Sequence, residues 1–361
     1  MNLTKSISTL LAAAAIAAAT GLGACSGSAD SPEAATAGNE VVLQFSLTTG
    51  AAGSDGSRAA DICDGEEQAE AWEDYLFTAR TNILIYRHTD SADGALIARF
   101  TGSDLGGSDR LASSVTLRLT DDYLLNIRDA VVDIVVVANA ELPADFSSIE
   151  KVAAHSCSYS KPSETSGIPM YGIRRGIYLG YLAGEGTEES PLMCGTVNLL
   201  RAYAKTEVLS SLPEGYTLTD VTVTTAQGKS FYPAPYNAAG KWHLTNTTDI
   251  TAPCVPSAAA TADFTGATAE RAIRFYLPES PASTGNYITL SVTGPDGKKT
   301  VTDRKIELGL YDEEGKFKPG SSLDIIRNHI YRYEIAFTPD ADVTLMVRVR
   351  KWGYHKIEFD M

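Results

Sequence analysis

The chain is 361 residues long, with 44% hydrophobic and 21% charged residues, 30 glycines and 15 prolines. This balance is typical of a globular protein with room for two cores, and it excludes a disordered tail and a single small domain. Because 45 acidic residues outnumber 30 lysines and arginines, the formal net charge is −15. Phosphate backbones and anionic membrane surfaces repel such a chain, so we expect no nucleic-acid partner.

Residues 1–24 have the features of a lipoprotein signal peptide. Lys5 gives a positive start, residues 7–19 are apolar but too few to span a bilayer, and the string LGAC ends at Cys25 in the form of a bacterial lipobox. The Cys25 thiol is therefore the predicted lipid acceptor, and the alternative is an ordinary secretory signal with an incidental cysteine. Residues 25–39, rich in Ser, Ala and Gly, predict a flexible tether.

Four cysteines remain after Cys25, an even number for an exported chain: Cys63, Cys157, Cys194 and Cys254. One or two disulfides are possible, with three pairings that the sequence does not separate, and free buried thiols are the alternative. No C-x-x-C pair is present and the five histidines are isolated. We therefore expect neither a metal nor a cofactor.

The first predicted strand covers residues 41–47. Its apolar side chains alternate on one face, which is the pattern of a half-buried strand: Val41, Leu43, Phe45 and Leu47. Residues 48–64 follow as a loop of Gly, Ser, Ala and Asp with a single basic residue, Arg58, near its centre. A loop of this length is usually functional or mobile.

Most of the remaining chain also reads as short strands separated by Gly, Pro, Asn and Asp turns, which predicts an all-β chain of β-sandwiches. The predicted strands are 82–86, 95–100, 114–119, 133–139, 176–182, 196–209, 217–225, 272–277, 286–292, 298–308, 329–337 and 343–349. Helical periodicity is limited to 142–154 and 66–76. The polar loop 184–191 divides the chain into an N-terminal domain over 40–188 and a C-terminal domain over 189–361.

Several strings carry a family resemblance: VVLQ at 41–44 leading to SRA at 57–59, IPMYG at 168–172, LRAYAK at 200–205, FYLPE at 275–279, and NHIYRYEI at 328–335 followed by Trp352. Together with the lipobox they resemble the fimbrillins, the FimA/Mfa-like lipoprotein precursors of type V pilus subunits. The resemblance implies two transthyretin-like β-sandwich domains in tandem. It also implies that a trypsin-like protease cuts after an arginine behind the first strand, here at Arg58-Ala59. Arg80 is the rival cut site, and the strand at Ile83 is expected to shield it.

Loss of the first strand would open an apolar groove with unpaired backbone groups, which a strand of the next subunit fills by β-augmentation. Four buried side chains offer roughly 6 to 12 kcal/mol before ordering costs. Donor candidates near the C-terminus alternate in the same way: Val343, Leu345, Val347, Val349, Ile357 and Phe359. Residues 343–349 alternatively complete the sheet of their own domain, which leaves 352–361 as the donor. The donor strand and the groove are different parts of one subunit, so the contact between subunits is head-to-tail. Such a contact need not close into a ring, and it yields a filament.

Little in the sequence indicates an enzyme, because adjacent carboxylates on a strand face opposite ways and no G-x-S-x-G string occurs. The resemblance implies a structural fimbrial subunit for adhesion and biofilm formation, made as an outer-membrane lipoprotein and then displayed in the surface fimbrium. Its implied partners are related subunits and the protease. The alternative is an anchor, tip subunit or surface binding lipoprotein that keeps its lipid, with Tyr232, Tyr236 and Trp242 as candidate sugar-stacking rings.

Overall fold

The computed structural model describes residues 40–49, 63–67, 69–90, 94–106, 108–126, 129–224, 230–235, 273–282, 286–312, 316–338 and 341–352. All of them belong to the compact unit Asn39–Met361. The described residues form nineteen strands, one α-helix and several 3₁₀ turns. The prediction of an all-β chain with few short helices is confirmed.

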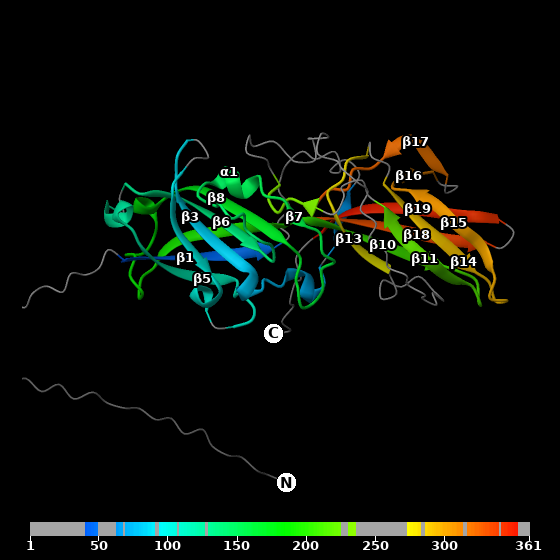
Figure 1. Ribbon diagram of the computed structural model, residues 1–361, viewed down its shortest axis with the longest axis horizontal. Coiled ribbons are helices and arrows are strands. Elements are labelled where there is room, and N and C mark those ends of the chain that lie inside the picture. Colours follow the sequence, from blue (N-terminus) through cyan, green and yellow to red (C-terminus); the bar gives the residue numbers. More distant parts are fainter. Residues whose placement is uncertain are drawn as a thin grey trace, which may run out of the picture. The chain divides into compact units, whose positions relative to one another are not determined.

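A seven-stranded sheet has the order β4-β3-β6-β8-β9-β1-β5. Figure 1 labels five of its strands, β1, β3, β5, β6 and β8. Its strands are β1 (Glu40–Thr49), β3 (Thr81–Arg87), β4 (Leu96–Thr101), β5 (Ser114–Thr120), β6 (Val131–Ala138), β8 (Met170–Tyr178) and β9 (Leu192–Arg201). The central strand β6 is apolar except at Asp133, β3 carries the apolar run 83–86, and the side chains of both strands are buried on both faces. This first sheet therefore has two apolar faces to cover.

The helix α1 (Ile149–Ala153) covers one of these faces. Ile149 and Val152 pack with Leu84 and Tyr86 of β3 in one apolar cluster. The Ser148 hydroxyl accepts from the Lys151 backbone N–H at the N-terminus of the helix. The helix expected over 142–154 is thus wrong in length, because the residues before 149 are not helical and Leu142 and Phe146 pack against the apolar cluster of the sheet instead. The helix expected over 66–76 is replaced by β2 (Cys63–Glu67) and the 3₁₀ turn η2 (Ala71–Asp74).

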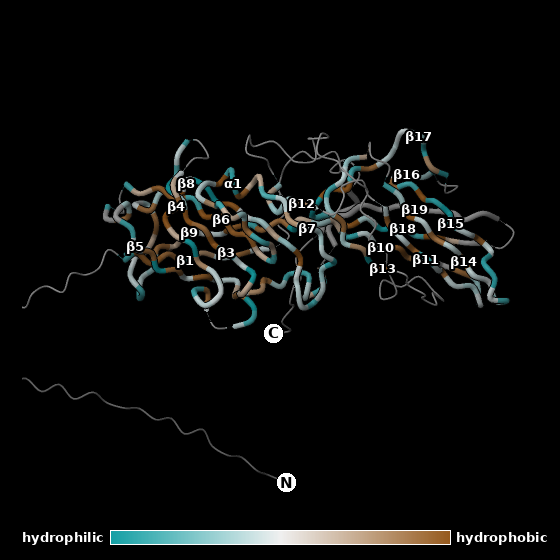
Figure 2. Tube along the Cα trace, viewed as in Figure 1, coloured by the Kyte–Doolittle hydropathy of each residue, from teal (hydrophilic) through white to brown (hydrophobic). Residues whose placement is uncertain are grey.

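A second sheet has the order β13-β10-β18-β19-β2 and a third the order β11-β14-β15. The strands are β10 (Tyr203–Ser211), β11 (Thr217–Thr224), β13 (Ile273–Pro278), β14 (Tyr287–Thr293), β15 (Lys299–Glu307), β18 (His329–Thr338) and β19 (Ala341–Trp352). Apolar residues of both sheets form one shared core. In Figure 2 hydrophobic residues are brown, and brown segments recur along these strands. Two small pairs complete the list: β7 (Cys157–Ser158) with β12 (Ser230–Phe231), and β16 (Gly309–Tyr311) with β17 (Phe317–Ser322).

The chain changes sheets at a single residue, Ala202. β9 belongs to the first sheet and β10 to the second. The prediction of a single strand over 196–209 is therefore wrong, because this segment contributes to two strands. Ala202 interrupts the run because its N–H donates to the Pro169 carbonyl (2.7 Å) instead of to a ladder partner. The strand expected over 176–182 also differs: β8 ends at Tyr178, and a 3₁₀ turn, η6 (Leu179–Tyr181), follows. Sheet membership thus changes beyond the domain boundary predicted after residue 188.

Candidate site of strand exchange

The strand β1 lies inside the first sheet and not at its edge. It pairs antiparallel with β5, where Leu43 is opposite Leu117, and parallel with β9, where Leu47 is opposite Val197. Both of its backbone edges are therefore hydrogen-bonded. Removing β1 alone would separate β5 from the other five strands and leave a slot one strand wide between β5 and β9.

The apolar face of β1 is fully buried. Val41, Leu43, Phe45 and Leu47 are between 0 and 5% exposed and all belong to the largest apolar cluster of the described residues. Their predicted alternation on one face is confirmed. Val42 on the opposite side is also buried, at 2% exposed, because the 184–190 loop passes close by and Gly186 accepts a hydrogen bond from the Val42 N–H (2.9 Å). One face of β1 is therefore buried along its length, while on the other face Val42 is buried and Ser46 and Thr48 are exposed.

Polar contacts hold the two ends of β1. At its start, the Arg118 guanidinium of β5 pairs with Glu40 (3.0 Å) and with Glu188 of the loop (2.5 Å). These hydrogen bonds, first that to Glu188 and then that to Glu40, raise the pKa of Arg118. At its end, the Thr48 hydroxyl donates to Asn198 on β9 (2.8 Å). The Arg118 contacts are solvent-exposed, so they guide the position of β1 more than they stabilise it.

A β-bulge fixes the register between β1 and β9. The pairing shifts between Gln44 and Ser46, where Cys194 and Gly195 of β9 together face Phe45. Gly195 has a φ of 78°, and an added Cβ there would lie 2.5 Å from the Arg174 guanidinium. Only glycine fits this left-handed position without strain. Cys194 is fully buried, and burial raises the pKa of its thiol to about 12.

Several predicted site residues lie outside the described residues: Cys25, Arg58, Ala59, Ile357 and Phe359. The rival cut site Arg80 ends the 3₁₀ turn η3 (Thr78–Arg80), and its side chain is exposed. The next residue, Thr81, is fully buried as the first residue of β3. A protease needs an extended segment on both sides of the bond, which the burial of Thr81 does not offer.

The candidate donor residues Val343, Leu345, Val347 and Val349 all lie on β19. β19 pairs antiparallel with β18 along most of its length, with Val347 opposite Tyr333 and Val349 opposite Tyr331. On its other edge β19 pairs in parallel with β2. β19 is thus part of the second sheet of its own chain.

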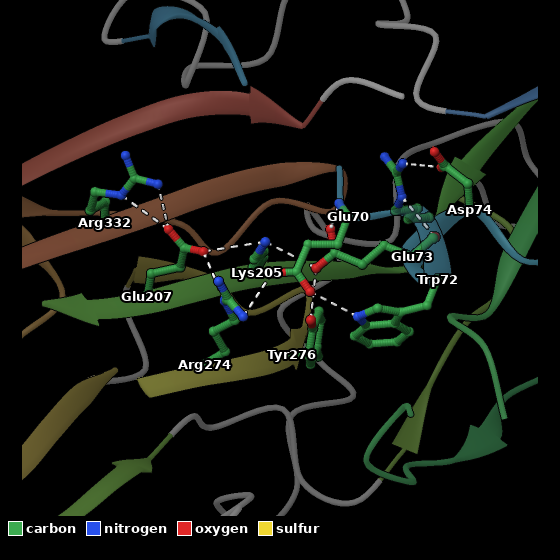
Figure 3. Close-up of polar contacts among 10 residues, drawn as sticks. Glu70, Trp72, Glu73, Asp74, Lys205, Glu207, Arg274, Tyr276 and Arg332 are labelled. Atoms are coloured by element: carbon green, nitrogen blue, oxygen red, sulfur yellow. Dashed lines mark hydrogen bonds and ion pairs between the residues drawn. The ribbon is translucent and has the colours of Figure 1, made fainter. Parts of the chain in front are cut away.

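A buried polar network joins η2 to the second sheet (Figure 3). The Glu73 carboxylate, 0% exposed, accepts a hydrogen bond from the Tyr276 hydroxyl (2.7 Å) and pairs with the Lys205 ammonium (3.0 Å). Lys205 also pairs with Glu207 (3.2 Å), and Glu207 in turn pairs with Arg332 of β18 (2.6 Å). A continuous chain of charges therefore runs from η2 across β10 to β18.

Arg201, the last residue of β9, extends this network into the first sheet. Its guanidinium is fully buried and donates to the Asn328 side chain (3.0 Å) and to the Asp74 carboxylate. Its Nε donates to the Glu73 carbonyl (3.4 Å). η2 therefore binds residues of both strands that flank Ala202, and it fixes the place where the chain passes from the first sheet to the second.

The charges of the network balance one another. Burial by itself disfavours the Glu207 carboxylate, but the Lys205 charge and the Arg332 hydrogen bond outweigh it, so the pKa of Glu207 lies below its ordinary value. Burial, with the nearby Glu73 charge, raises the pKa of Tyr276 far above its ordinary value. This network was not predicted from the sequence, although two charged residues at alternate positions of the strand 203–211, Lys205 and Glu207, indicate that their side chains are covered by another segment.

The remaining candidates from the sequence are the cysteines and the aromatic residues proposed to stack on sugars. Cys157 and Cys194 are free thiols, and both are buried. Tyr232 is half-buried, while Tyr236 and Trp242 lie outside the described residues. Among the described residues, no three His, Cys, Asp or Glu side chains are placed to hold a metal ion. None of the helices in this part of the chain is long and apolar enough to cross a membrane.

No protein-family model and no curated protein matches the sequence. The tip fimbrial protein Mfa3 of Porphyromonas gingivalis, solved with a C-terminal truncation, matches in structure with a TM-score of 0.52 and 16% identity, over 87% of this chain and 100% of that chain. The chain has a fimbrillin-like fold. A protein of Parabacteroides distasonis assigned to cell adhesion shares the fimbrillin-like fold with a TM-score of 0.51 and 14% identity, over 89% of this chain and 99% of that chain. The resemblance seen in the sequence strings is thereby confirmed at the level of the fold.

Proposed function

We propose that the protein is a structural subunit of a surface fimbria that polymerises by donor-strand exchange. The observation that carries this proposal is β1, a complete interior strand whose apolar face is buried and whose two edges are hydrogen-bonded. A slot of this kind presents two open backbone edges and an apolar floor when β1 leaves. Only another extended strand satisfies both at once.

The position of the predicted cut supports the removal of β1. Arg58 lies between β1, which belongs to the first sheet, and β2, which pairs with β19 in the second sheet. Cleavage at Arg58-Ala59 would therefore separate β1 from the chain and leave both β1 and β2 uncut. The segment after the cut stays attached through β2 and through the buried Glu73 contacts that follow it.

The proposed donor is the C-terminal tail, residues 353–361, with Ile357 and Phe359 as its apolar side chains. β19 is an unsuitable donor because leaving its own sheet would break its ladder with β18. The tail follows β19 directly and alternates apolar and polar residues. The partner is a second fimbrial subunit, whose slot receives the tail, and the head-to-tail contact repeats into a filament.

Export as a lipoprotein completes the proposal. Cys25 carries the lipid and holds the precursor at the outer membrane until a trypsin-like protease cuts after Arg58. The lipid and β1 then leave together, and the subunit enters a surface fimbria that serves adhesion and biofilm formation. The role is non-enzymatic and needs no cofactor.

A second candidate is an anchor, a tip subunit or a surface binding lipoprotein that keeps β1. The likeness in fold to a tip fimbrial protein favours it. Such a subunit retains the Cys25 lipid and never opens its slot. The two candidates therefore differ in whether the Arg58 bond is cut in the native protein.

Replacement of the two arginines tests the proposal. We expect Arg58→Ala to block removal of β1 and to abolish ladders of subunits that resist sodium dodecyl sulfate in sheared surface material. Arg80→Ala is the matched control, and because Thr81 is buried, processing and ladders should be unchanged. Normal ladders from the Arg58→Ala protein would contradict cleavage at this bond.

A further inference from the structure

A cavity of about 540 Å³ lies on the outer face of the first sheet, away from β1. It forms where the segment 140–146, which leaves β6 and crosses the sheet, passes over the start of β3 and the end of β4. Arg80, Asn82, Arg99 and Phe146 contribute to its wall. Its volume is in the range of pockets that bind small ligands.

Arg99 is held in a fixed orientation in this cavity. Its Nε and Nη2 both donate to the Asn82 side-chain oxygen (3.0 and 2.8 Å), and its guanidinium carbon lies 4.9 Å from the centre of the Phe146 ring. Asn82 lies on β3 and is only 7% exposed. Its side-chain oxygen, which accepts both hydrogen bonds from Arg99, is therefore held in place by the sheet. The Nη1–Nη2 edge of Arg99 is left to donate, and two parallel N–H groups match the two oxygens of a carboxylate.

Arg80 adds a second cation to the same wall. Its Nη1 donates to the Ser166 carbonyl (3.0 Å), which leaves its other nitrogens to donate. Among the described residues, neither Arg80 nor Arg99 lies within ion-pair distance of a carboxylate. Two unpaired arginines that share one cavity are notable in a chain of formal net charge −15.

Glu141 also lines the cavity, but among the described residues no ion pair joins its carboxylate to Arg80 or Arg99. Its charge acts on His155 and Cys157, and its carbonyl accepts a hydrogen bond from the Cys157 thiol (3.5 Å). The other wall residues suit a sugar ring. Thr101 brings a hydroxyl, and Leu142 and Pro143 offer apolar surface to the C–H face of a pyranose.

We propose that this cavity binds an acidic sugar of the uronic acid class, with its carboxylate on the free edge of Arg99 and within reach of Arg80. Asn82 and Thr101 then contact hydroxyl groups, and Phe146 keeps the Arg99 fork in place. Recognition needs both the charge and the ring, because the cavity is much larger than a carboxylate. The site uses no residue of β1, β5 or β9, so it stands whether or not the subunit polymerises.

Isothermal titration of the purified full chain with D-glucuronate, D-glucose and acetate tests this site. We expect glucuronate to bind at least tenfold more tightly than either glucose or acetate. Arg99→Gln should weaken glucuronate binding at least tenfold. Arg99→Lys should also weaken it several-fold, since a lysine keeps the charge but lacks the fork. Arg87→Gln is the control, because Arg87 lies on β3 outside the cavity and pairs with Asp121, and it should bind as the parent does.

Thermal unfolding of each variant shows whether it is folded, and the exposed position of Arg99 makes loss of the fold unexpected. Glucuronate that binds no more tightly than glucose would overturn the role of the arginines. Acetate that binds as tightly as glucuronate would overturn recognition of the sugar. Equal glucuronate binding by the parent and by folded Arg99→Gln would place any binding elsewhere on the chain.

Discussion

Replacing Phe45 with alanine separates the stability of the precursor from that of the filament. Phe45 is 1% exposed in the middle of β1, where it faces the β9 bulge. Truncating a buried phenylalanine destabilises a protein by about 3–5 kcal/mol, through lost burial and through the cavity that remains. The uncut precursor should lose this amount. The filament should lose nothing, because the proposed cut removes β1 before assembly.

The matched control is Leu117→Ala on β5. Leu117 is also 1% exposed, lies opposite Leu43 and stays in the mature subunit, so its truncation should cost about 2–5 kcal/mol in both forms. Urea unfolding of the precursor, kept uncut by Arg58→Ala, measures the first form. The temperature at which sheared ladders dissociate in sodium dodecyl sulfate measures the second. Ladders weakened by Phe45→Ala as much as by Leu117→Ala would refute the reasoning, since β1 would then remain in the filament.

Three further predictions concern the slot and the buried network. The depressed pKa of Glu207, from an ordinary 4.5, stabilises the fold fully above about pH 4.5 and ceases to do so as the pH falls through the folded pKa. Glu207→Gln, itself destabilising by about 3–5 kcal/mol, should therefore flatten the acid loss of unfolding free energy by up to about 1.4 kcal/mol per pH unit in urea titrations, and an unchanged slope would contradict it. Iodoacetamide should leave Cys194 unlabelled in the precursor and label it in cut subunits with an empty slot, as read by peptide mass. Cys157, the other buried free thiol, is the internal reference. If Cys194 is labelled to the same extent as Cys157 in both forms, this would argue against an opened slot. Gly195→Ala should destabilise the precursor by about 1–2 kcal/mol, because its φ is 78°, and unchanged urea unfolding would show that the bulge relaxes.

Strand positions could be predicted from the sequence because alternation is local. Phe45 and its neighbours repeat every second residue, and β1 has the predicted face and nearly the predicted ends. Where only a few apolar residues define the periodicity, as in the helix predicted over 142–154, the predicted element was wrong. Residues 142–148 have apolar positions that suit a helix, yet they lie along an apolar sheet face, and tertiary contact overrides the local preference.

Sheet membership could not be predicted, since it depends on pairings between distant residues. β1 pairs in parallel with β9, about 150 residues further along the chain. The change of sheet at Ala202 depends on a hydrogen bond to Pro169, which leaves no periodic trace in the sequence. The buried Glu73–Lys205 pair was missed for the same reason, because its partners come from segments that are not neighbours in sequence.

The native surface protein itself provides the most direct test of the account. We would determine the N-terminal sequence and the intact mass of protein sheared from cells. We expect a start at Ala59 and a mass without lipid. A lipidated start at Cys25, with no shorter form present, would contradict it and would identify a subunit that keeps β1 in its own sheet.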